Sequence, residues 1–398
     1  MSLPPPRRVG PALIVLAYVA FVSLGLPDTV LGIAWPSLRA RFGLSQQALG
    51  AVLATAVAGY ATSSALASRL APRLGVGGLL ALSTALVSLG LLGYALATAW
   101  GLFVPWAAVI GLGSGAIDAA LNSFAAHHLP ARHMNWLHAC YSLGATIGPA
   151  MMTSILAAGA SYRAGYGVLS AALAAMALTF FSTRARWDDD GPVAAGALDG
   201  ERSHALARPR VWLQVSIFFV YTGIELGTGA WAFSALREVR GLEVAAAGAW
   251  TTAYYGSILS GRVLVGFVVD RVGPDRLLRL ATVGAVAGAL LFSFAPGVTG
   301  QVGLLVLGLS LAPMFPTLMA RTPARVGADV ASESIGYQVS AATIGSAVLP
   351  SAFGFVAERA GLATLGAALL LATGLLLLLH EVLLRSSRRA GGGPGSPA

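Results

Sequence analysis

The chain has 398 residues, of which 56% are hydrophobic and 10% are charged, whereas a soluble domain carries about 25% charged residues. A folded protein of this size keeps an extensive surface, so this much apolar area cannot all be buried in a water-soluble core, and a lipid bilayer is the expected solvent. The formal charge of +9 comes from arginines scattered between apolar runs, which argues against nucleic-acid binding.

Twelve apolar runs are long enough to cross a bilayer, since a membrane helix needs about 20 mainly apolar residues. Their number and length predict an all-α membrane protein with twelve transmembrane helices. In chain order, we expect the spans at roughly 12–38, 47–68, 77–99, 102–125, 136–159, 164–183, 211–236, 244–269, 277–295, 302–320, 334–356 and 362–384.

A polar segment at 184–210 divides these helices six and six. It carries aspartates and glutamate among arginines and has little apolar content. We therefore expect an N-terminal six-helix bundle at 1–183, a cytoplasmic linker at 184–210, a C-terminal six-helix bundle at 211–385 and a disordered tail at 386–398.

The two halves resemble each other at an almost constant offset. Gly25 recurs 198 positions later as Gly223, and the tripeptide Thr-Ile-Gly at 146–148 recurs 197 positions later at 343–345. Two parallel six-helix repeats are a known transporter architecture, with the substrate at the membrane midplane between the halves.

The arginines also predict the orientation. With a cytoplasmic N-terminus, eighteen arginines fall in the inside segments and helix ends, and six fall outside. Because cytoplasmic loops carry the excess of positive charge, we expect both termini in the cytoplasm of a bacterial-type inner membrane.

Three acidic residues fall well inside predicted helices, namely Asp28, Asp118 and Glu225. A charge in the bilayer costs at least about 2.5–3.5 kcal/mol, so such side chains usually face a cavity and have a function. We predict proton coupling at these three positions, with Asp118 as the main site. The alternative is a packed structural carboxylate that is hydrogen bonded to a neighbour.

Asp118 lies on a stripe of one helical face. Gly111, Gly115, Asp118 and Asn122 are spaced by 4, 3 and 4 residues, and the two glycines allow another helix to approach closely. Desolvation there penalises the ionised carboxylate, so Asp118 could take up and release a proton.

A sugar site needs amides and carboxylates for the hydroxyl groups and aromatic rings for the apolar faces of the sugar. Each candidate has the alternative of facing lipid or packing between helices. The predicted substrate-binding residues are Asn122, Trp35, Tyr141, Trp231, Tyr254 and Gln338.

Arg262, Asp270 and Arg271 belong to a charged run near the predicted cytoplasmic end of the eighth helix. An acidic residue followed by arginines at a helix end can form an ion-pair latch, so we predict a gating role for these three. The alternative is a set of ordinary arginines on the cytoplasmic side.

The histidines His127, His128, His133 and His138 cluster around one predicted loop. No carboxylate lies nearby in sequence, and the first two point apart on a helix, so we expect solvated loop residues and no metal site. The one cysteine, Cys140, is expected to be inert packing.

The run GRVLVGFVVDRVGPDRLL at 261–278 resembles a loop signature of the major facilitator superfamily. Its counterpart in the first half, at 67–80, has Pro72 where that family's aspartate is expected. The resemblance implies the twelve-helix major facilitator fold over nearly the whole chain.

A narrower resemblance is to the fucose permease and its relatives, which are proton-coupled hexose symporters. Asp28 resembles that family's helix 1 aspartate, and Asp118 with Asn122 is similar to its helix 4 acid and asparagine, with aspartate here for glutamate. Tyr141 stands where the family has asparagine. The resemblance implies that Asp28 and Asp118 are the proton and sugar carboxylates.

The leading hypothesis is a secondary active transporter that couples protons to symport of a sugar or another small polar solute. The alternatives are proton-coupled efflux of amphipathic compounds or sugars on the same fold, a membrane enzyme, and a channel. We find no nucleophile–base or metal motif for an enzyme and no repeated pore loop for a channel. We therefore expect a monomer with no cofactor, whose partners are a small-molecule substrate, protons and the lipid bilayer.

Overall fold

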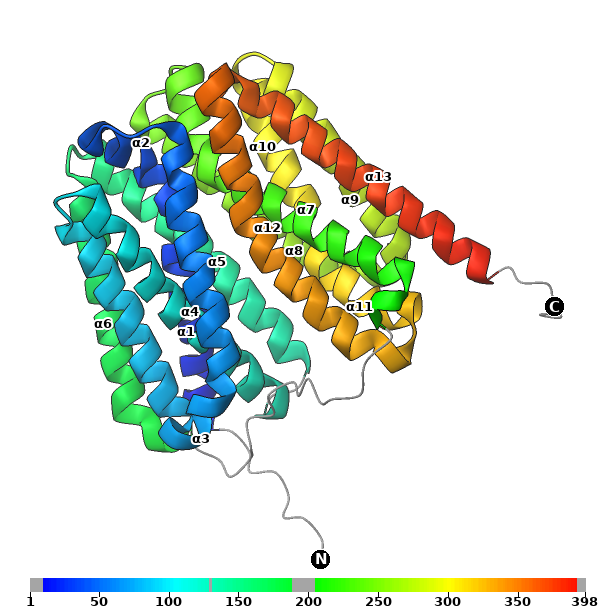
Figure 1. Ribbon diagram of the computed structural model, residues 1–398, viewed down its shortest axis with the longest axis horizontal. Coiled ribbons are helices and arrows are strands. Elements are labelled where there is room, and N and C mark those ends of the chain that lie inside the picture. Colours follow the sequence, from blue (N-terminus) through cyan, green and yellow to red (C-terminus); the bar gives the residue numbers. More distant parts are fainter. Residues whose placement is uncertain (1–9, 129–130, 188–204, 392–398) are drawn as a thin grey trace, which may run out of the picture. The chain divides into compact units, whose positions relative to one another are not determined.

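A computed structural model describes residues 10–128, 131–187 and 205–391, and these residues form helices and short connections without any strand. Twelve helical segments of this described part are long and apolar enough to cross a membrane (Figure 1). The prediction of an all-α protein with twelve membrane helices is therefore confirmed. The chain divides into two compact units, Met1–Ala197 and Leu198–Ala398, which we call the N-terminal and C-terminal units.

The N-terminal unit contains the first six spans. The first span is broken, because α1 ends at Asp28, directly after Pro27, which lacks the N–H that continues a helical ladder. The second and third spans form one long element, α3, with a sharp turn at Gly75, whose φ of 69° and ψ of 164° favour glycine. The helices are α1 (Pro11–Asp28), α2 (Leu31–Phe42), α3 (Leu49–Leu96), α4 (Trp100–His128), α5 (Ala131–Ala157) and α6 (Tyr162–Thr183).

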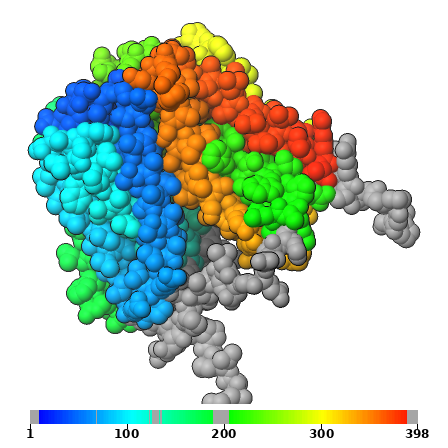
Figure 2. Space-filling model, viewed as in Figure 1, coloured from blue at the N-terminus to red at the C-terminus, as the bar shows by residue number. Residues whose placement is uncertain are grey.

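The C-terminal unit contains the other six spans. One of them, Gly297–Val326, is made of two helices that meet at Pro313. The helices are α7 (Pro209–Ser234), α8 (Val244–Val272), α9 (Pro274–Phe294), α10 (Gly297–Leu311), α11 (Met314–Val326), α12 (Ala331–Ala360) and α13 (Leu365–Gly391). Figure 2 shows α7 (green), α12 (orange) and α13 (red) packed side by side within this unit.

The repeated glycines mark equivalent helix crossings in the two units. A Cβ at Gly25 on α1 would lie 2.9 Å from the backbone nitrogen of Ala145 on α5. A Cβ at Gly223 on α7 would lie 2.9 Å from the carbonyl oxygen of Gly345 on α12. The same close approach in both units gives a physical reason for the recurrence of the two glycines at this offset.

Large apolar side chains are exposed along the outer helices. Leu178 is 70% exposed, Phe294 is 70% exposed and Leu371 is 76% exposed. Large apolar side chains exposed to this extent on the spans fit a lipid environment.

Candidate functional site

Asp118 is held by two side chains at the junction of α3 and α4. The hydroxyl of Tyr60 donates a hydrogen bond to Oδ2 at 2.6 Å, and the amide of Asn122 donates one to Oδ1 at 2.8 Å. The carboxylate is half-buried, and its segment of α4 belongs to the span Trp100–Asn122. Both oxygens of Asp118 therefore have a protein donor.

The glycine stripe explains how Tyr60 reaches Asp118. A Cβ at Gly111 would lie 2.9 Å from the backbone nitrogen of Tyr60, and one at Gly115 would lie 2.5 Å from the hydroxyl oxygen of Ser63. The predicted close approach of a neighbouring helix is confirmed, and the first half of α3 is that helix. Sequence reasoning missed Tyr60, because nothing local to it shows which helix packs on the stripe.

Asp28 lies at the C-terminal end of α1, and its side chain is exposed. The hydroxyl of Tyr141 on α5 donates a hydrogen bond to Oδ2 of Asp28 at 2.8 Å. The close crossing at Gly25 brings these two helices together, since a Cβ there would collide with the carbonyl oxygen of Tyr141. The structure thus joins two of the predicted site residues.

Neither Asp28 nor Asp118 forms an ion pair with any residue that the structure describes. Their hydrogen-bond donors are neutral hydroxyl and amide groups. The negative charge of each carboxylate is therefore not compensated by a basic side chain within the described part of the chain.

Glu225 on α7 is different, because it is paired with a cation. Its Oε1 lies 3.2 Å from Nη2 of Arg262 on α8, and the two side chains are 12% and 17% exposed. The hydroxyl of Tyr221 also donates a hydrogen bond to this carboxylate, and Tyr254 donates one to the carbonyl oxygen of Glu225 at 2.9 Å. Arg262, predicted as a gating residue, and Glu225, predicted as a proton site, are partners in this structure.

Three predicted substrate ligands are fully buried between helices. The indole of Trp35 donates to the side-chain oxygen of Gln46 at 3.2 Å, and that of Trp231 donates to the carbonyl oxygen of Pro350 at 2.8 Å. Gln338 is also fully buried and accepts a hydrogen bond from a threonine hydroxyl. These contacts fit the alternative of packing between helices, so we leave the three residues out of the proposed substrate site. Tyr254, bonded to the backbone, is left out for the same reason.

The ion pairs at the junction of α8 and α9 are not made by the residues that the sequence suggested. Asp270 and Arg271 are exposed, and Asp270 has no ion pair with a residue that the structure describes. Asp275, in the first turn of α9, instead bonds Arg321 at 2.7 Å and Arg325 at 2.8 Å on α11. The sequence signal that could have identified Asp275 is its position directly after a proline, at the start of a helix.

Two of the clustered histidines contact α1. The ring nitrogen Nδ1 of His133 lies 2.5 Å from the hydroxyl oxygen of Tyr18, and the ring of His138 packs edge-on against Phe21 at 5.7 Å between centroids. The prediction that these two residues lie in a loop was wrong, because both lie on α5; the side chain of His138 is exposed. The side chains at 127 and 128 lie outside the described residues. No group of metal-binding side chains occurs in the described part of the chain.

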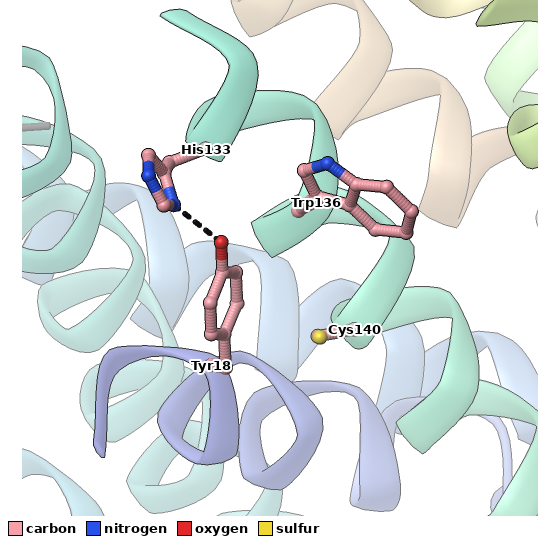
Figure 3. Close-up of a pocket in the computed structure, with 4 residues that line it drawn as sticks. All are labelled: Tyr18, His133, Trp136 and Cys140. Carbon is pink, nitrogen blue, oxygen red and sulfur yellow. Dashed lines mark hydrogen bonds between the residues drawn. The ribbon is translucent and has the colours of Figure 1, made fainter. Parts of the chain in front are cut away.

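A cavity of about 520 Å³ opens beside this contact (Figure 3). It is lined by Tyr18 on α1 and by His133, Trp136 and Cys140 on α5. Cys140, which was expected to be inert packing, lies on the wall of this cavity.

Comparison with known proteins settles the family. Residues 17–350 match the model of the family described as Major Facilitator Superfamily. The chain belongs to the Major Facilitator Superfamily. It is therefore a multi-pass membrane transporter and not an enzyme, and it has the twelve-helix fold of that superfamily.

The individual proteins that this chain resembles are distant from it in sequence. "Bypass of stop codon protein 6" of Saccharomyces cerevisiae is 22% identical over 390 residues, which cover 88% of this chain and 78% of that protein. The crystal structure of a bacterial homolog to the human lysosomal transporter Spinster matches with a TM-score of 0.78 at 13% identity, covering 98% of this chain and 100% of that one. The E. coli fucose:proton symporter FucP matches with a TM-score of 0.62 at 19% identity, covering 94% and 99%. At these identities the structural likeness establishes the fold alone.

Proposed function

We propose that this member of the superfamily is a proton-coupled symporter of a sugar or another small polar solute, working by alternating access. The observation that carries the proposal is the pair of carboxylates in the N-terminal unit. Asp28 and Asp118 lie within membrane spans, each is held by a tyrosine hydroxyl, and neither is neutralised by a described basic residue.

An uncompensated carboxylate in a membrane span suits proton coupling. Its ionised form is penalised when water is excluded, and the charge cannot be cancelled by a neighbouring cation. Protonation removes the charge, so the transition between the outward-open and inward-open conformations is easier when the proton is bound. A carboxylate that must be neutral during this transition couples the movement of solute to the movement of protons.

The hydrogen bonds suggest a division of roles between the two carboxylates. Both oxygens of Asp118 have protein donors, and the Tyr60 bond connects α3 to α4. Bonds to an ionised acceptor are about twice as strong as neutral ones, so protonation of Asp118 would weaken this link between helices. We assign the coupling proton to Asp118.

Asp28 is the better contact for solute. Its side chain is exposed, and its bond to the Tyr141 hydroxyl leaves Oδ1 without a donor among the described residues. A carboxylate oxygen beside a phenolic hydroxyl can accept and donate hydrogen bonds to the hydroxyl groups of a sugar.

Glu225 has a smaller part in this proposal. Because Arg262 compensates its charge, Glu225 does not need a proton to be tolerated in the membrane. We propose that this ion pair keeps α7 and α8 in register, and that it becomes a proton site only if the arginine moves away.

The excess of arginine in alternate connections supports a further proposal, that both termini are cytoplasmic in a bacterial-type inner membrane. We also propose that the monomer is the transporting species, since each unit contributes its own polar network.

Uptake into proteoliposomes tests the proposed function. The protein would be reconstituted and supplied with labelled L-fucose, D-glucose or D-galactose, with and without an acidic exterior. We expect at least one sugar to accumulate only when the proton gradient is present, and a protonophore to abolish the accumulation. Uptake that ignores the gradient, or proton-driven export of amphipathic dyes with no sugar uptake, would contradict the proposal and favour the efflux alternative.

A further inference from the structure

The cavity beside Tyr18 and His133 (Figure 3) lies on the same two helices as the Asp28–Tyr141 pair, but neither Asp28 nor Tyr141 is among its described lining residues. Tyr18 precedes Asp28 by ten residues of α1, which is about 15 Å at the helical rise of about 1.5 Å per residue. His133 likewise lies about two turns before Tyr141 on α5. The distance along the helices between the Tyr18–His133 pair and the Asp28–Tyr141 pair is longer than a single sugar ring, so one monosaccharide cannot contact both polar pairs.

The lining of this cavity has the chemistry of a site for a neutral ring that bears hydroxyl groups. The indole of Trp136 is 56% exposed and offers a flat apolar face, which suits the apolar face of a pyranose. The Tyr18 hydroxyl and the His133 imidazole are polar and lie 2.5 Å apart, so each is already oriented by the other.

The size of the cavity agrees with this chemistry. Its volume of about 520 Å³ lies within the range of about 300–1,000 Å³ that is usual for small-molecule sites. Such sites combine an apolar wall with a small number of oriented polar groups, and this cavity has one indole wall and one hydroxyl–imidazole pair.

We infer that this cavity is a second binding subsite for the transported solute, which is a neutral pyranose, and that Trp136 is its stacking wall. The inference rests on the proposed function for the class of solute. In a protein whose N-terminus is cytoplasmic, the subsite lies on the cytoplasmic side of Asp28 and receives the solute between the carboxylate and the aqueous phase. Tyr18 and His133 bind the hydroxyl groups of the ring.

The natural cysteine makes the subsite measurable. Cys140 is the one cysteine of the chain and lines the cavity, so a maleimide labels a single place in the unmodified protein. The rate of Cys140 alkylation by N-ethylmaleimide would be measured on purified protein in detergent, with no proton gradient. The probes are L-fucose, D-glucose and D-galactose, with the acyclic polyol mannitol as the control that lacks a flat ring face.

We expect at least one of the sugars to slow the alkylation several-fold in a saturable manner, while mannitol has no such effect. Trp136→Ala should remove the protection and Trp136→Phe should restore most of it, because phenylalanine keeps a flat apolar ring. Trp212→Ala is the matched control, since Trp212 is 54% exposed on α7 and does not line the cavity, and its protection should equal that of the natural protein.

A variant of the carboxylate site separates the two places. Because Cys140 is next to Tyr141, solute bound at Asp28 could shield the thiol, and Asp28→Asn would then abolish the protection. We expect the protection to persist in Asp28→Asn at a similar sugar concentration. Loss of protection in that variant, equal protection by mannitol, or full protection in Trp136→Ala would each overturn the subsite.

The failure of the subsite can also be told from the failure of the proposed function. If a sugar accumulates in proteoliposomes but no sugar protects Cys140, the symporter proposal stands and the subsite is wrong. If a sugar protects Cys140 through Trp136 but is not driven by protons, the subsite stands and the proposed coupling is wrong.

Discussion

Replacement of Asp118 by asparagine tests the central step of the proposed mechanism. Asparagine has nearly the shape of the protonated carboxylic acid but cannot release a proton, so Asp118→Asn is expected to stay permanently in the neutral form. We expect it to abolish proton-driven accumulation while counterflow exchange of labelled solute is at least partly retained. Exchange needs solute binding and movement of the protein, but it needs no net proton transfer.

The magnitudes follow from the structure and from the size of the gradient. A proton that moves across a difference of two pH units supplies about 2.7 kcal/mol, enough for about 100-fold accumulation of a neutral solute carried with one proton. Without the proton, accumulation should fall to the equilibrium ratio. Hydrogen bonds to charged groups contribute about 1.5–3 kcal/mol and neutral ones about 0.5–1.5 kcal/mol, so the bond that Asn122 donates to the remaining oxygen of residue 118 weakens by about 1 kcal/mol. The other oxygen becomes an NH2 donor, so the Tyr60 hydroxyl must accept a bond there instead of donating one. This is an upper value, because Asp118 is only partly buried and solvent screens the interaction.

The assay is uptake and counterflow in proteoliposomes, with Tyr60→Phe and Asp28→Asn as comparisons. Tyr60→Phe removes the 2.6 Å hydrogen bond but keeps the carboxylate, so it should retain coupling at an altered rate. Asp28→Asn should lower the affinity for solute more than it lowers coupling. If the Asp118→Asn protein still concentrates its solute when a proton gradient is supplied, the reasoning is refuted and the coupling role passes to Asp28 or Glu225.

Three other changes have expected outcomes. Glu225→Gln leaves the largely buried Arg262 without a carboxylate partner, so the thermal unfolding midpoint in detergent should fall. The double variant with Arg262→Leu should recover part of the lost midpoint. An unchanged midpoint in Glu225→Gln would show that the pair adds nothing to stability. Gly25→Ala should destabilise the α1–α5 crossing, because its Cβ would collide with α5, whereas Gly167→Ala meets nothing within 4 Å and should be neutral in the same thermal assay; equal effects would contradict the crossing. A reporter fused after Leu384 should be active on the cytoplasmic side, and periplasmic activity would reverse the proposed topology.

The number of helices and the placement of Asp28, Asp118 and Glu225 within them could be predicted from the sequence. These features depend on local composition, because an apolar run of sufficient length must become a helix in lipid, where every backbone N–H and C=O needs a partner within the segment. The spacing of Gly111 and Gly115 also identified a face for close helix packing, since residues three and four apart lie on one side of a helix.

The partners of these carboxylates were decided by the tertiary structure. Tyr60 is 58 residues from Asp118, Tyr141 is 113 residues from Asp28, and Arg262 is 37 residues from its partner Glu225. Each contact depends on where two helices cross and how each is rotated, and no local pattern specifies this.

The same reason explains why several aromatic residues have a different environment from the one that the sequence predicted. Membrane helices that are apolar on every side have no polar face to show which side meets a neighbour, which meets lipid and which meets a cavity. Trp35 and Trp231 are consequently buried, while Trp136 and Cys140 line a cavity that the sequence did not indicate. Tertiary packing distinguishes these positions, because it sets which side chains a neighbouring helix covers. Trp231 donates to Pro350 on α12, whereas Trp136 and Cys140 lie on α5 beside Tyr18 of α1.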